Sequence, residues 1–132
     1  MNITIDTSAL IAVIINEPEK QKIIEITTGC RLIFCPNSVH WEIGNAFSAM
    51  LKRKRITLEQ VKIAIDEFRK IPIQFIDVNL NSTMELVNNY HIYAYDAYLI
   101  TCALQSNTPL LTLDKKLIDV AKSAGIEVLE VN

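Results

Sequence analysis

The sequence predicts an α/β protein of three layers, α/β/α, around a mainly parallel sheet of about five strands. Short apolar runs rich in β-branched residues alternate along the chain with longer helical patterns, which is typical of βαβ units. Only three Gly and four Pro occur, so long elements and short loops are expected. Half of the 132 residues are hydrophobic, which suits one domain over residues 1–132 with one core.

The N-terminal part is predicted to run strand, helix, helix, strand. Residues 2–6 are short, apolar and β-branched, as in a buried strand. Residues 7–16 indicate a short helix that Pro18 stops, and Pro18 suits the first turn of a second helix over residues 17–29. Residues 31–35 form the second predicted strand.

Capping residues mark the helices that follow. Asn37 or Ser38 is expected to cap a third helix that runs to about Arg53. Thr57 and Gln60 have the spacing of a capping box before a fourth helix. The rest of the chain is predicted as a strand at 73–78, a helix at 81–90 capped by Asn79, a helix from about Tyr95 to Asn107, a strand at 109–113, a helix at 115–125 and a strand at 126–131.

Composition narrows the function classes. Thirteen basic residues stand against 15 acidic ones, a formal net charge of -2, which excludes a strongly basic nucleic-acid binder but not an acidic site that holds cations. Cys30, Cys35 and Cys102 form no C-x-x-C pair, so free thiols in a reducing cytoplasm are expected. No apolar run reaches the roughly 18 residues of a membrane helix, and no basic region precedes the first apolar stretch, so neither a membrane span nor a signal peptide is predicted.

Two acids are predicted at one edge of the sheet. Asp6 ends the first strand and Asp114 follows the fourth. In a parallel sheet these carboxyl ends share one edge, where ligands of open α/β sheets bind. Each acid also suits the N-cap of the helix after it, so capping alone remains an alternative explanation.

Two further acids lie on predicted helices. Glu42 falls at the margin of the apolar face of its helix, and Asp96 begins a helix that is apolar nearly all round. A boundary Glu reaching water and an Asp interacting with the helix dipole are the alternatives. All four carboxylates in apolar surroundings would require compensation by cations. Hard oxygen ligands favour Mg²⁺ or Mn²⁺, whereas His40 and His91 lack metal-ligand spacing.

These segments resemble the motifs of PIN-domain nucleases, and most of all the VapC toxins of type II toxin–antitoxin systems. The resemblance covers essentially the whole chain and rests on four strings in order: IDTSALIAVIINEPE with Asp6 and Ser8, SVHWEIGNAF with Glu42, YDAYLITCAL with Asp96, and LLTLDKKL with Thr112 and Asp114.

The resemblance implies metal-dependent hydrolysis of RNA phosphodiester bonds. It assigns Asp6, Asp96 and Asp114 as metal ligands, and Glu42 as a ligand directly or through water. Ser8 and Thr112 would position water, metal or substrate. Many family members carry another acid two residues after the fourth motif's Asp, where this chain has Lys116. This departure leaves open whether one metal ion or two are bound, with Asp119 as a possible substitute acid.

Substrate and partner surfaces are less specific in the sequence. Lys115 and Lys116, beside Asp114, are the basic residues best placed to contact RNA, while the run 52–55 is explained better as a solvated helix end. Tyr93, Tyr95 and Tyr98 could stack on bases, but packing in the core explains them as well. An exposed Trp41 is expected on a partner or dimer surface, or over a neighbouring helix.

The resemblance further implies a homodimer and an antitoxin bound near the site, for which the first helices would offer a groove. Two alternatives keep the fold: a housekeeping PIN ribonuclease in RNA maturation, and a non-catalytic PIN-like binding module. A phosphoacceptor receiver domain is disfavoured, because Asp6 is followed by Thr7 rather than a second acid and Glu42 and Asp96 would be unexplained.

Overall fold

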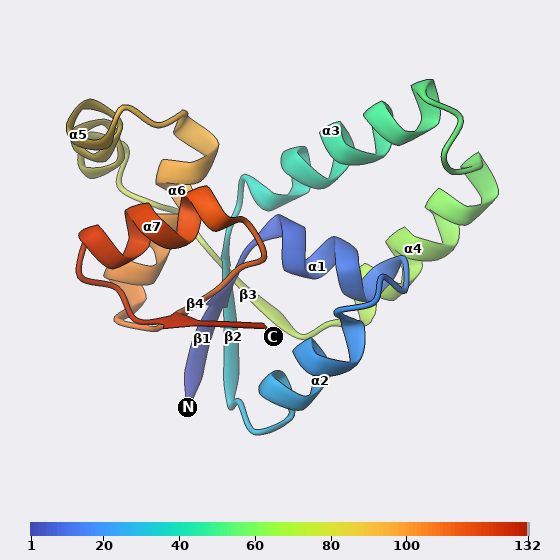
Figure 1. Ribbon diagram of the computed structural model, residues 1–132, viewed down its shortest axis with the longest axis horizontal. Helices are drawn as coiled ribbons and strands as arrows, with labels where there is room; N and C mark the ends of the chain where they lie inside the picture. Colours follow the sequence, from blue (N-terminus) through green and yellow to red (C-terminus); the bar gives the residue numbers. More distant parts are fainter. Residues whose placement is uncertain (132) are drawn as a thin grey trace.

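The structure of the chain, a computed structural model, describes residues 1–131 and confirms the predicted α/β architecture (Figure 1). Five strands form one sheet in the order β3-β2-β1-β4-β5, and every neighbouring pair is parallel. The strands are β1 (Asn2–Ile5), β2 (Leu32–Pro36), β3 (Ile73–Ile76), β4 (Leu110–Leu111) and β5 (Val128–Leu129).

Seven helices in the described residues connect these strands. They are α1 (Thr7–Ile14), α2 (Lys20–Thr28), α3 (Val39–Lys52), α4 (Leu58–Lys70), α5 (Leu80–Tyr90), α6 (Ala94–Ser106) and α7 (Lys115–Ser123). Figure 1 shows α1 to α4 on one side of the sheet and α5 to α7 on the other. Right-handed crossovers require this, because the chain moves outward from β1 through β2 to β3 and then returns to β4 on the far side of β1.

The direction of strand order therefore reverses between β1 and β4. Such a switch point opens a crevice at the carboxyl ends of the two strands, where ligands bind in open α/β sheets. Ile5 is in register with Leu111, and the Asp6 N–H donates to the Leu111 carbonyl at 3.1 Å. Asp6 and Thr112, the next residues along these strands, consequently lie side by side at the crevice.

The core holds this edge in place. Ile3, Ile5, Leu110 and Leu111 of β1 and β4 are buried, as parallel strands covered on both faces must be. The predicted all-round burial of α6 holds for most of the helix, although Leu104 is 47% exposed. Asp96 thus begins a helix whose body is fixed in the core, so its carboxylate is carried on a rigid support.

Several local predictions are confirmed. Thr57 and Gln60 form a complete capping box at the start of α4, and the Asn79 side chain accepts from the Ser82 N–H at the start of α5. Gly125 lies just beyond α7 with φ of 84°, the left-handed conformation that favours glycine after a helix.

Other local predictions are wrong. The second helix begins at Lys20, and Pro18 lies in a turn before it rather than in its first turn. Asn16 adopts a positive φ of 61° between α1 and Pro18, and Pro18 and Glu19 then form a second turn that leads into α2. Ser38 occupies the N-cap position of α3 but makes no capping hydrogen bond. The last two strands are also shorter than predicted. Among residues 1–131, no helix is long and apolar enough to cross a membrane.

Candidate active site

Asp6 is the most deeply buried of the four predicted acids, with 3% of its surface exposed. It is the N-cap of α1, and its Oδ1 accepts from the Ala9 N–H at 3.0 Å. Burial raises the pKa of Asp6 from 3.8 to about 6; hydrogen bonds from Thr112, Ala9 and Ser8 oppose this rise and the Asp114 charge adds to it. Capping is therefore real, but it does not remove the free-energy cost of ionising this carboxylate.

Two hydroxyls hold the Asp6 carboxylate in one orientation. Ser8 Oγ donates to Asp6 Oδ1 at 2.7 Å and lies 2.9 Å from Oδ2, and Thr112 Oγ1 donates to Oδ2. The same hydroxyls accept from the backbone beyond β4: Ser8 from the Leu113 N–H at 3.1 Å and Thr112 from the Asp114 N–H at 3.0 Å. The first and fourth motifs are thereby joined through side chains that were predicted from sequence as supporting residues.

Glu42 enters from the first turn of α3. Its Oε2 accepts from Ser38 Oγ at 3.1 Å, one helical turn earlier. Burial raises the pKa of Glu42 from 4.5 to about 7, hydrogen bonding from Ser38 and Thr7 lowers it, and the charges of Asp6 and Asp96 raise it further. The Thr7 hydroxyl is buried beside Glu42 and faces its carboxylate.

Asp96 lies in the first turn of α6, partly exposed. Burial raises its pKa, the nearby Asp114 charge raises it further, and Lys116 lowers it. Charge interactions thus link Asp6 with Asp114, Asp114 with Asp96, and both Asp6 and Asp96 with Glu42. The structure brings all four sequence-predicted acids together at the switch-point edge of the sheet, and these four residues are here called the acidic cluster.

Asp114 differs from the other three. It is exposed to solvent, so the expectation that all four acids occupy apolar surroundings is wrong for this one. Its Oδ1 accepts from the Lys116 N–H at 3.0 Å and from the Leu117 N–H at 3.4 Å, which caps α7. Asp114 therefore has a structural task besides its place in the cluster.

The two tasks of Asp114 can be separated by mutation. Asp114→Ala is expected to lower the free energy of unfolding by about 1 kcal/mol because it removes the cap. Asp114→Asn retains an acceptor oxygen and should cost only a few tenths of a kcal/mol. Urea denaturation of both metal-free variants measures this difference. Equal losses would show that charge, and not capping, is what Asp114 contributes to the fold.

The donor set of the cluster fits a hard divalent cation. The ion pairs among residues 1–131 involve none of the four acids, so their mutual repulsion is not balanced by Lys or Arg contacts. No three His, Cys, Asp or Glu side chains in the described part of the chain are grouped tightly enough to hold an ion by themselves. Mg²⁺ accepts such a site, because it keeps several waters and binds through one or two carboxylates plus substrate oxygens.

The other predicted residues differ in whether they lie close to the acidic cluster. Lys116 lies near enough to Asp96 to lower its pKa, and Lys115 is exposed at the start of α7. Residues 52–55 are exposed at and beyond the end of α3 opposite Glu42. Asp119 lines a cavity with Thr112, Lys115 and Lys122, but its charge does not contribute to the pKa shifts of Asp6, Glu42 or Asp96.

Two side chains beside the acidic cluster, those of Thr7 and Ser38, are not predicted as site residues from the sequence. Thr7 follows Asp6 directly and was treated only as evidence against a receiver domain. Ser38 was treated as a helix cap, whereas it donates to Glu42. The i, i+4 spacing of Ser38 and Glu42 on one helix face could have identified this pair. Thr7 carried no comparable signal.

Solved structures share the fold over almost the whole chain. PAE2754 from Pyrobaculum aerophilum superposes with a TM-score of 0.72 at 20% identity, covering 97% of this chain and 84% of the other. VapBC2 from Rickettsia felis, bound to a DNA fragment from its promoter, gives 0.71 at 17% identity with both chains fully covered. VapC20 from Mycobacterium tuberculosis, a toxin that cleaves the sarcin-ricin loop, gives 0.68 at 12% identity, covering 97% and 98%. No curated protein sequence matches the chain.

A family model decides the assignment. The model described as the PIN domain matches residues 3–123, a stretch that contains Asp6, Glu42, Asp96 and Asp114. The VapC neighbours, at 17% and 12% identity, share this fold. The chain belongs to the PIN domain family.

Proposed function

We propose that this protein is a Mg²⁺- or Mn²⁺-dependent endoribonuclease and the toxin of a toxin–antitoxin pair. The observation that carries the proposal is the acidic cluster at the switch point, where burial and mutual repulsion raise the pKa values of Asp6, Glu42 and Asp96. Clustered carboxylates with raised pKa values are typical of functional sites, and among residues 1–131 none of the four acids forms an ion pair.

The proposed reaction is hydrolysis of an RNA phosphodiester bond. A bound divalent ion would lower the pKa of water and offset negative charge on the phosphate. Asp6, Asp96 and Asp114 are the residues that would hold the ion. Glu42, with a pKa raised to about 7, is suited to accept a proton from water near neutral pH.

Positioning is the task of the surrounding hydroxyls. Ser8 and Thr112 fix the Asp6 carboxylate from two sides, and Ser38 fixes Glu42. Lys115 and Lys116 are placed to contact the RNA phosphates at the mouth of the crevice, since both are exposed beside Asp114. Fixed geometry of this kind contributes to rate because reacting groups need not be reoriented in the transition state.

An apolar groove of about 500 Å³ is the proposed antitoxin site. Its walls include Leu10 and Ile14 of α1 and Ile23 and Ile24 of α2. The other two apolar residues that the sequence offers for such a groove, Ile11 and Ile15, do not line it. An antitoxin segment with an apolar stripe would cover this surface.

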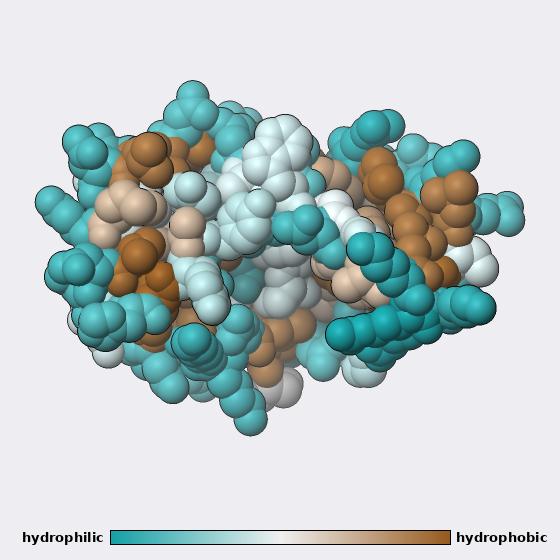
Figure 2. Space-filling model, turned by 90° about the horizontal axis from the view of Figure 1, so that it is seen from above, coloured by the Kyte–Doolittle hydropathy of each residue, from teal (hydrophilic) through white to brown (hydrophobic). Residues whose placement is uncertain are grey.

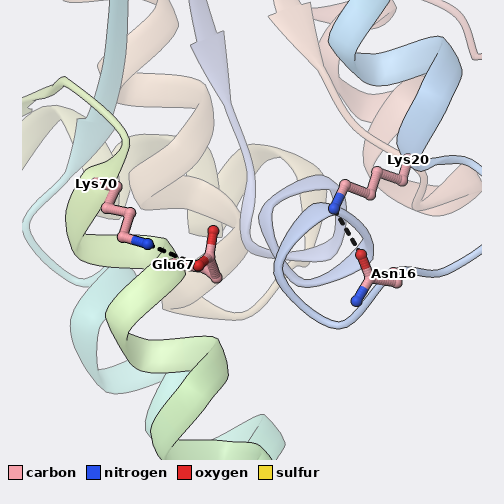
Figure 3. Close-up of polar contacts among 4 residues, drawn as sticks. All are labelled: Asn16, Lys20, Glu67 and Lys70. Carbon is pink, nitrogen blue, oxygen red and sulfur yellow. Dashed lines mark hydrogen bonds and ion pairs between the residues drawn. The ribbon is translucent and has the colours of Figure 1, made fainter.

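Charged side chains border the groove. Lys20 donates to Asn16 at 2.5 Å and Lys70 pairs with Glu67 at 2.9 Å (Figure 3). Arg31 also lines it. Three basic residues against one acid favour an antitoxin segment with acidic residues beside its apolar stripe. We further propose a homodimer, for which Leu80 and Met84 on α5, 58% and 42% exposed, are available apolar contacts.

RNA cleavage by the purified protein tests the proposal. Structured RNA should be cleaved in the presence of Mg²⁺ or Mn²⁺, and chelation should abolish cleavage because the acidic cluster alone repels the phosphate. The purified product of a small neighbouring gene should inhibit the reaction if the chain is a toxin. Cleavage that persists in chelator would refute the metal-dependent mechanism, and cleavage indifferent to that partner would favour a housekeeping ribonuclease.

A further inference from the structure

A second cavity, of about 340 Å³, lies beside the acidic cluster and has no role in the reaction described above. Its walls come from the start of α3, the segment after β3 and the first turns of α6, and they include Ser38, Trp41, Tyr95 and Tyr98. The volume is at the lower end of the range for small-molecule sites. We refer to this cavity as the aromatic pocket.

The aromatic pocket shares residues with the margin of the cluster. Ser38 lines the pocket and donates to Glu42 at 3.1 Å, and Tyr95 immediately precedes Asp96. A phosphate held at the cluster would therefore place an adjoining nucleotide at the mouth of the pocket. Figure 2, which looks onto this edge of the molecule, shows a zone of intermediate hydropathy between more hydrophobic patches.

Two aromatic side chains at the pocket are exposed to water, which is unfavourable in free energy. Trp41 is 66% exposed and Tyr95 is 38% exposed, although burying large aromatic surface is strongly favourable. The rings of Tyr95 and Tyr98 are 6.2 Å apart between centroids and inclined by 60°, so they form two walls rather than one flat surface. Exposed rings around a cavity are suited to stacking on the faces of bases.

A polar pair in the pocket distinguishes a base from an apolar protein surface. Asn37 Nδ2 donates to Asp77 Oδ1, and both residues line the pocket. The ion pairs among residues 1–131 do not include Asp77, so its carboxylate keeps acceptor capacity. An apolar partner would remove water from this carboxylate and leave Asn37 as its one side-chain donor, which is costly for a charged group.

Base edges differ in what they offer to a carboxylate. Guanine presents two adjacent donors, N1–H and the N2 amino group, which match the two oxygens of a carboxylate, and adenine and cytosine present an exocyclic amino group. Uracil presents a single donor, N3–H, between two carbonyl oxygens that repel a carboxylate. The carboxylate of Asp77 therefore favours guanine most and uracil least. On these grounds, and resting on the proposed ribonuclease function, we propose that the aromatic pocket binds a nucleobase next to the scissile phosphate and discriminates against uracil.

Trp41 provides a direct test, because it is the only tryptophan of the chain. Nucleoside monophosphates contain no phosphodiester bond and cannot be cleaved, so the four of them can be titrated in Mg²⁺ while Trp41 fluorescence is followed. We expect saturable quenching, with uridine monophosphate binding about tenfold more weakly than guanosine monophosphate. Asp77→Asn should reduce this difference to less than about threefold.

A matched pair of tyrosines separates stacking from general damage. Tyr95→Leu removes a wall of the pocket and should weaken binding and raise KM for RNA about tenfold with little change in kcat. Tyr93→Leu is the control, because Tyr93 is 83% exposed two residues away and does not line the pocket. Circular dichroism of both variants should match that of the native protein.

Two results would overturn the inference. Equal effects of the two tyrosine variants on KM would do so while leaving the nuclease proposal intact, provided that RNA is still cleaved. Trp41 emission that responds to protein concentration but not to nucleotides would show that a second copy of the chain covers this face. Failure of all RNA cleavage would contradict the proposed function, and the nucleotide titration would still decide whether the pocket binds bases.

Discussion

Asp6→Asn is expected to reduce metal-dependent RNA cleavage by at least about a hundredfold without destabilising the protein. Loss of residues that merely support metal ligands costs roughly 10- to 100-fold in activity, and a direct ligand should cost at least as much. The buried position of Asp6 at the switch point makes it the firmest candidate for that role. Rates with saturating Mg²⁺ and with Mn²⁺ measure the effect.

The stability of Asp6→Asn follows from the raised pKa. Burial raises the pKa of Asp6 from 3.8 to about 6, which corresponds to about 3 kcal/mol against the ionised form in the folded state. Asparagine caps a helix as well as aspartate does. The free energy of unfolding of the metal-free variant at pH 8 should therefore equal or exceed that of the native protein.

Asp119→Asn is the control for this experiment, since Asp119 is an exposed acid of α7 whose charge does not contribute to the pKa shifts of Asp6, Glu42 or Asp96. It should leave the cleavage rate unchanged, which would also show that Asp119 does not replace the acid missing at Lys116. Near-native cleavage by Asp6→Asn would remove Asp6 from the ligand set. A large loss of stability would mean that capping outweighs charge repulsion at this position.

The buried acids should lower the free energy of unfolding of the metal-free protein as pH rises. Carboxylates in ion pairs have the opposite effect. The pKa of Asp6 is raised to about 6 in the folded state from 3.8, and the pKa of Glu42 is raised to about 7 from 4.5. Between these values the folded state binds more protons than the unfolded state, so these two groups lower the free energy of unfolding as pH rises. Their contribution is complete above about pH 7.

The measurement is a difference between two proteins. Other carboxylates also titrate, so the free energy of unfolding of Asp6→Asn is subtracted from that of the native protein at each pH. The native protein should lose about 2–3 kcal/mol relative to the variant between pH 4 and pH 7. A constant difference, or one that changes in the opposite direction, would show that the Asp6 carboxylate is not penalised by burial.

Divalent cations should reverse this loss. Binding to the folded state alone stabilises a protein by about 2.7 kcal/mol at a concentration one hundred times Kd. Addition of Mg²⁺ at pH 8 should therefore raise the unfolding temperature of the native protein and have little effect on Asp6→Asn. Equal shifts for both proteins would indicate nonspecific ion binding.

Local sequence signals predicted the fold well where one physical effect dominated. The apolar β-branched run of residues 2–5 has no comparable helical alternative, and it is β1. Thr57 and Gln60 form their capping box because both hydrogen bonds are made within four residues. The prediction for Pro18 is wrong because Pro18 and Glu19 form a turn before α2, and the fixed φ of proline suits such a turn as well as it suits the first turn of a helix.

The sequence by itself determined the order of the elements, the family motifs and the identity of the four acids, because periodicity and residue type are local properties. Only the tertiary structure decided how the acids differ. Asp6 is buried at the reversal of strand order, while Asp114 is exposed and caps α7. The register of β1 against β4, the Ser38–Glu42 bond and the aromatic pocket also depend on chain segments packing together. Burial and charge coupling arise from that packing, so no single segment of the sequence encodes them.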